Sequence, residues 1–94
     1  MNLALAIGES IRTKRMEKKM TLRDLSVKSH ISVGYLSEVE RGSKEVSSTV
    51  LDAIAQGLEV PLSKIVGDAS DYIRESEVFY EITRDVEMEK TLTW

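Results

Sequence analysis

The segment from Met20 to Lys44 constrains the fold most, because its sequence predicts two short helices joined by a tight turn. Thr21 and Ser32 are both preferred N-cap residues, and each precedes a short stretch with apolar residues at helical spacing. The second helix is expected to end at Gly42, because glycine readily adopts the left-handed conformation at a helix C-terminus. Two helices that cross steeply leave the second one projecting outward, and that geometry fits a DNA major groove. The segment therefore predicts a DNA-binding helix pair.

Periodicity along the rest of the chain predicts an all-α fold. One helix is expected over about residues 5–18, and another after Ser47 and Ser48, where apolar residues recur at i, i+3, i+4 and i+7. A short fifth helix, Leu62–Val66, is expected to close the core, and Gly67 to mark a boundary. We therefore assign residues 1–67 to a five-helix domain and residues 68–94 to an acidic segment. That segment is expected to be helical, because Glu, Arg and Met are frequent in it and no Gly or Pro follows Asp68.

Charge is distributed unevenly along a chain whose net charge is −3. From Arg12 to Lys28, seven basic residues face two acidic ones. From Asp68 onward, three basic residues face eight acidic ones. One face of the domain can therefore be positive while the C-terminal segment is negative, which is compatible with nucleic-acid binding.

The composition argues against several functional classes. The chain has no cysteine, so neither a disulfide framework nor a thiolate metal site is available. The apolar run over residues 3–7 is too short to span a membrane, and no basic residue precedes it as in a signal peptide. Ser29 and His30 are adjacent but lack an orienting acid, and no metal-ligand cluster or cofactor motif occurs. We expect a cytoplasmic, nucleoid-associated protein that is not an enzyme and has no cofactor.

The residues from Ser32 to Gly42, SVGYLSEVERG, closely match the pattern S-x-x-Y-[LI]-S-x-[IV]-E-R-G. On this run and its flanking helices, the chain resembles the Cro/repressor-type (XRE-like) helix-turn-helix regulators of bacteria and phages over about residues 7–66. The resemblance implies a lambda-repressor-like helix-turn-helix domain with a C-terminal helical dimerisation segment. The longer run GYLSEVERGSKEVSSTVLDAIAQGLEVPL is similar to actinobacterial activators of Clp protease genes. The chain departs from the family at helix ends where glycine is common, and we expect positive φ angles there: Lys19, His30 and Glu59.

In the docking mode of that family, residues early in the second helix of the pair reach base edges, and residues around them hold phosphates. The expected base contacts are Val33, Gly34, Ser37 and Glu38. The expected phosphate contacts are Thr21, Arg23, Ser32, Tyr35, Arg41, Ser43 and Lys44. Val33 can pack on a thymine methyl group, and Glu38 can accept a hydrogen bond from a cytosine amine. Within the resemblance, Arg15 and Glu40 are expected to form a structural ion pair.

One such domain contacts few base pairs, so specificity normally requires two half-sites about 34 Å apart. We expect the acidic segment to supply the dimer contact through an apolar stripe formed by Tyr72, Phe79, Ile82 and Val86. A two-fold homodimer predicts a pseudo-palindromic operator in double-stranded DNA. No small-molecule effector, metal or membrane partner is expected.

The narrower similarity implies an activator of protease and proteostasis promoters, with RNA polymerase as a further partner. Two alternatives remain open from the sequence. The protein could be a phage-type repressor or an antitoxin, or it could be a protein-interaction module that does not bind DNA. Strong salt dependence of DNA binding would separate the regulators from the interaction module.

Overall fold

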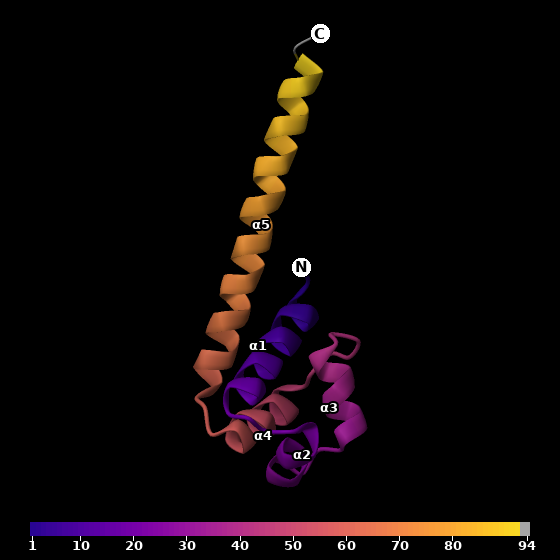
Figure 1. Cartoon of the computed structure of the whole chain (residues 1–94), viewed down its shortest axis with the longest axis vertical. Coiled ribbons are helices and arrows are strands. Elements are labelled where there is room, and N and C mark those ends of the chain that lie inside the picture. The colour runs from indigo at the N-terminus through magenta and orange to yellow at the C-terminus, as the bar shows by residue number, and fades with distance from the viewer. Residues whose placement is uncertain (93–94) are drawn as a thin grey trace.

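The computed structural model describes the backbone of residues 1–92 and the side chains of residues 1–79. The described backbone forms five helices and no strand, so the predicted all-α class is confirmed. The helices are α1 (Leu3–Glu17), α2 (Leu22–Ser29), α3 (Val33–Glu40), α4 (Ser48–Leu58) and α5 (Leu62–Leu92). The first four enclose a core, and the last runs beside α1 before it extends away from the other helices (Figure 1).

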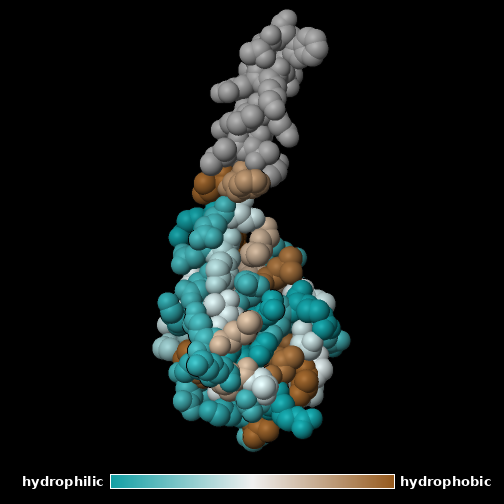
Figure 2. Space-filling view, in the orientation of Figure 1, coloured by the Kyte–Doolittle hydropathy of each residue, from teal (hydrophilic) through white to brown (hydrophobic). Residues whose placement is uncertain are grey.

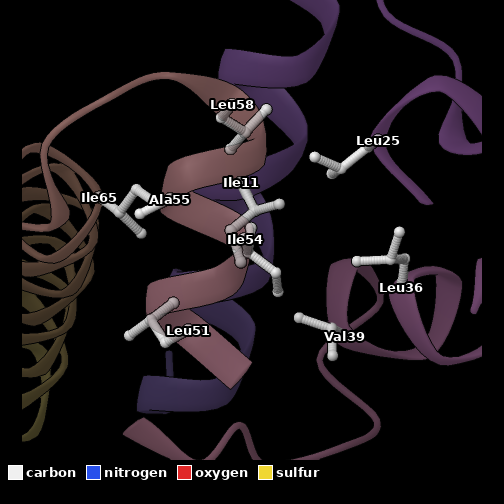
Figure 3. Packing of buried hydrophobic residues seen from close by; sticks show 9 residues of the cluster. All are labelled: Ile11, Leu25, Leu36, Val39, Leu51, Ile54, Ala55, Leu58 and Ile65. Atoms are coloured by element: carbon white, nitrogen blue, oxygen red, sulfur yellow. The ribbon is translucent and has the colours of Figure 1, made fainter. Parts of the chain in front are cut away.

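The core is built from one face of each helix. Figure 3 shows Ile11 of α1 and Ile54 of α4 at its centre, with Val39 of α3 on one side and Ile65 of α5 on the other. Nine residues form this cluster: Ile11, Leu25, Leu36, Val39, Leu51, Ile54, Ala55, Leu58 and Ile65. The helical spacing of the α4 residues therefore predicted their burial correctly.

Side-chain caps and left-handed residues define the helix ends. Thr21, Ser32 and Ser47 each accept a hydrogen bond from a backbone N–H in the first turn that follows. The positive φ angles expected at non-glycine helix ends are confirmed at Lys19 (55°), His30 (61°) and Glu59 (58°). An L-residue in this conformation costs roughly 1 kcal/mol, so these turns hold some local strain.

The fifth helix differs from the sequence expectation. Instead of stopping at Val66, α5 continues through Gly67 as one helix of 31 residues. Gly67 is exposed, and an interior glycine costs a helix only about 1 kcal/mol relative to alanine. Burial of Ile65 and Ala69 against α1 offsets that cost. Leu62 and Val66, which were expected to close the core, are exposed, because they lie off the face that contacts α1.

Candidate nucleic-acid interface

The start of α2 is held by reciprocal hydrogen bonds between two exposed residues. The Thr21 hydroxyl accepts from the Asp24 amide at 3.0 Å, and the Thr21 amide donates to the Asp24 carboxylate at 2.9 Å. These bonds lower the pKa of Asp24 below its ordinary value. Arg23 is exposed beside this cap, as the phosphate-contact prediction requires. The role of Asp24 was not predicted, although a Thr-x-x-Asp spacing at a helix start is a capping signal.

The two faces of α3 have opposite environments. Leu36 and Val39 are fully buried, whereas Val33 is 40% exposed and Gly34 is also exposed. A Cβ atom built at Gly34 would have no neighbour within 4 Å, so no packing contact within the described structure requires glycine there. Ser37 and Glu38 lie half-buried, one turn further along. The four predicted base-reading residues therefore share one helix, with the first two freely accessible.

Ser37 and Glu38, the later two of the predicted base-reading residues, each interact with a basic side chain of the same chain. The Arg41 guanidinium donates to the Ser37 hydroxyl at 2.6 Å. The Lys44 ammonium lies 3.2 Å from the Glu38 carboxylate and 5.2 Å from the centre of the Tyr35 ring. Both pairs lie at the surface, with the Lys44 and Glu38 side chains 51% and 43% exposed, and such pairs contribute little to stability. These bonds can therefore be broken at little cost when a ligand approaches this face of α3.

The loop after α3 is fixed to the end of that helix. The amide and the hydroxyl of Ser43 both donate to the Glu38 carbonyl at 3.0 Å. Gly42 has a φ of 72°, and a Cβ there would lie within 2.8 Å of Leu5 in α1. Arg41, Ser43 and Lys44, which were predicted to contact phosphates, are exposed on this constrained turn.

A mostly buried ion pair connects α3 to α1, on the side of α3 that faces the core. Arg15 donates to the Glu40 carboxylate through Nε at 2.7 Å and through Nη2 at 2.9 Å, and its third bond goes to the Met20 carbonyl. The side chains are only 14% and 6% exposed, and the bonds to Glu40 raise the pKa of Arg15. Gly8 allows this close packing, because a Cβ there would lie 2.3 Å from the Val39 carbonyl. The predicted pair is thus present, while the role of Gly8 was missed.

The predicted dimerisation residues are only partly described. Tyr72 is half-buried, whereas Phe79 is 73% exposed and its neighbour Val78 is 50% exposed. Figure 2 shows hydrophobic atoms on α5 at the end of the coloured part of the chain. The side chains of Ile82 and Val86 lie outside the described residues. The described part of the stripe is accessible, as a contact with a partner requires.

Two kinds of feature are absent from the described residues. No helix among them is long and apolar enough to cross a membrane. No group of three or more His, Asp or Glu side chains in that part of the chain could hold a metal ion.

The chain matches the family model described as Helix-turn-helix over residues 11–65. It is 44% identical over 71 residues to the transcriptional regulator ClgR of Mycobacterium tuberculosis, covering 76% of this chain and 63% of that protein. It is 30% identical over 88 residues to the immunity repressor protein of Bacillus phage phi105, covering 94% of this chain and 60% of that one. The chain therefore spans a little under two thirds of the length of these curated relatives.

Solved structures extend the similarity over the long helix. The crystal structure of the clp gene regulator ClgR from Corynebacterium glutamicum matches with a TM-score of 0.85 and 34% identity, covering 95% of both chains. The conserved arrangement of the described helices and the family match agree with the resemblance seen in the residues from Ser32 to Gly42. The chain belongs to the Cro/repressor-type (XRE-like) helix-turn-helix family of transcriptional regulators.

Proposed function

We propose that this chain is a sequence-specific DNA-binding protein that acts as a homodimer and places α3 in successive major grooves of a promoter. The accessible first turn of α3 carries the proposal, because Val33 and Gly34 are exposed beside capped helix starts and a constrained basic turn. Val33, Gly34, Ser37 and Glu38 would face bases. Residues around them would hold phosphates: Thr21, Arg23, Ser32, Tyr35, Arg41, Ser43 and Lys44.

Selection of bound sequences from a random DNA pool, at near-physiological salt, tests this proposal. A pseudo-palindrome with half-sites about 34 Å apart is expected. Each protomer would bring three exposed cations to phosphates, Arg23, Arg41 and Lys44. Six neutralised phosphates per dimer predict that log K falls with log [salt] at a slope of about −5. A folded protein that enriches no sequence would contradict the proposal and favour the protein-interaction module.

Glu38 offers a test of base reading with a matched control. Glu38→Ala should relax the preference at one base position by about 1–3 kcal/mol per half-site, because a side chain that accepts from a cytosine amine is lost. Glu45→Ala removes the same charge from the neighbouring loop, where the side chain is also exposed. That control should change affinity for all sequences about equally. Equal effects of both variants at every base position would exclude a base-reading role for Glu38.

The proposal also covers which promoters are regulated and whether the protein activates or represses them. Similarity to two proteins named ClgR, one of which is described as a clp gene regulator, supports regulation of protease promoters. We propose that this regulation is activation of protease and proteostasis promoters, with RNA polymerase as the partner. The phage immunity repressor favours the alternative of repression. Transcription in vitro from a promoter that carries the selected site decides between them, since RNA synthesis rises for an activator and falls for a repressor. For an activator and for a repressor alike, we propose a cytoplasmic, nucleoid-associated location.

A further inference from the structure

Lys14 was counted in the basic segment, but its side chain is only 5% exposed. Its ammonium donates to the Asp68 carboxylate at 2.5 Å and to the Ser10 hydroxyl at 3.1 Å. The Ser10 hydroxyl in turn donates to the Ile65 carbonyl at 2.9 Å. These four residues, here called the α1–α5 joint, connect two successive turns of α1 to two successive turns of α5.

We propose that the α1–α5 joint fixes the direction of α5 and thereby sets the spacing between the two DNA half-sites. This inference rests on the proposed dimer on DNA. The joint would affect DNA binding only by fixing the direction of α5, so Lys14 and Asp68 are positioning residues and do not contact DNA.

Apolar packing alone would leave the direction of α5 poorly determined. Ile65 and Ala69 are fully buried where α5 contacts α1 and α4, but burial of apolar surface is not directional. Hydrogen bonds are directional, and the joint supplies three of them. A shift of α5 by one turn would also leave the Lys14 charge buried without its partner, which is unfavourable. The joint therefore selects one register and one rotation of the two helices.

The length of α5 amplifies any change at the joint. From Asp68 to Leu92 the helix rises about 36 Å, taking 1.5 Å per residue. A tilt of about 10° at the joint would move the far end by roughly 6 Å, which is close to two base-pair steps in the half-site spacing. A protein that dimerises through this helix needs its direction fixed to within a few degrees.

A double variant removes the joint while keeping its volume. Lys14→Met with Asp68→Leu replaces a mostly buried ion pair by apolar side chains, a change that often leaves stability similar. Ser10→Ala is a second, milder variant that removes the bond to the Ile65 carbonyl. Lys64→Met is the control, because Lys64 lies 3.4 Å from Asp68 but on the exposed side.

Two measurements on the full chain decide the question. Because the chain has no cysteine, spin labels can be attached at Val27→Cys and Glu77→Cys, two exposed positions on α2 and α5. The labelled chain is diluted into excess unlabelled chain, so that only the two labels on one protomer are measured. The distance between them should have one narrow distribution in the wild type and the control, and a broader one in the double variant and in Ser10→Ala. An unchanged distribution in both variants would overturn the inference whether or not the protein binds DNA.

Binding to paired half-sites with altered spacers is the second measurement. When the spacer changes by two base pairs, the DNA affinity of the wild type should fall by about tenfold or more. The affinity of the double variant should fall by less than about threefold. Equal spacer selectivity in both proteins would overturn the spacing claim. A wild type that binds no DNA would instead overturn the proposed function and the spacing claim together, while the label distances still decide whether the joint fixes α5.

Discussion

Substitution of Gly34 by alanine should make the protein more stable and DNA binding weaker. In the free protein the added methyl group meets no atom within 4 Å, and the backbone at Gly34 is ordinary helix. Alanine is favoured over glycine within a helix by about 0.5–1 kcal/mol, and because Gly34 lies in the first turn of α3 the gain should not exceed this range, roughly a two- to fivefold change in the folding equilibrium. For a domain of this size, such a gain raises the melting temperature by about 2–8 °C. Thermal unfolding followed by circular dichroism measures it.

On DNA the same methyl group should be unfavourable. If the first turn of α3 lies against the groove, the methyl group overpacks that contact at a cost of about 1–3 kcal/mol per half-site, at least fivefold in affinity. Gly67→Ala is the matched control, because Gly67 is another exposed helical glycine whose Cβ would also have open space. The control should gain the same stability and bind a half-site normally. Normal binding by Gly34→Ala would refute the placement of this turn in the groove.

Three further predictions follow from the ion pairs and the strained turns. Glu40→Gln should destabilise the fold by about 3 kcal/mol in urea unfolding, because Arg15 is left buried without its countercharge, and Arg15→Met with Glu40→Leu should recover most of that loss. The bond from Lys14 lowers the pKa of Asp68 below its ordinary 3.8, so the stabilisation by this carboxylate is present above that value and is lost as pH falls through the lower folded pKa. The stability difference between the wild type and Asp68→Asn should therefore be constant above about pH 5 and shrink below about pH 4; a difference independent of pH would exclude this contribution. Glycine should stabilise the protein by about 0.5–1 kcal/mol at each left-handed helix end without changing DNA affinity, as thermal unfolding and titration can show for Lys19, His30 and Glu59.

Local signals explain why most of the domain could be predicted from the sequence. The caps at Thr21 and Ser32 and the spacing of apolar residues in α4 act within one or two turns, so they can be read without knowing the tertiary structure. The left-handed conformations at His30 and Glu59 could also be predicted, because the sequence defined the ends of the preceding helices well.

The errors arise where a distant contact overrides a local preference. Gly67 was read as a boundary, yet the helix continues because Ile65 and Ala69 are buried on α1 and Asp68 is paired with Lys14. Nothing in the local pattern of α1 marks Lys14 as buried, since its partner lies 54 residues away. The role of Gly8 could not be predicted either, because it depends on close contact with a carbonyl of α3, which is distant in the sequence.

Lys14 and Arg15 are neighbours on α1, and successive helix residues point roughly 100° apart. Arg15 therefore reaches Glu40 in α3, while Lys14 reaches Asp68 in α5. Two cations from the basic segment thus form internal ion pairs with α3 and with α5, and neither is available to a phosphate. A loss of DNA affinity after substitution of either residue would not identify it as a DNA contact. The salt dependence of binding separates the two cases. Loss of a phosphate contact, such as the one proposed for Arg41, lowers the slope of log K against log [salt] by about one for each protomer, whereas loss of an internal ion pair lowers the affinity without changing that slope.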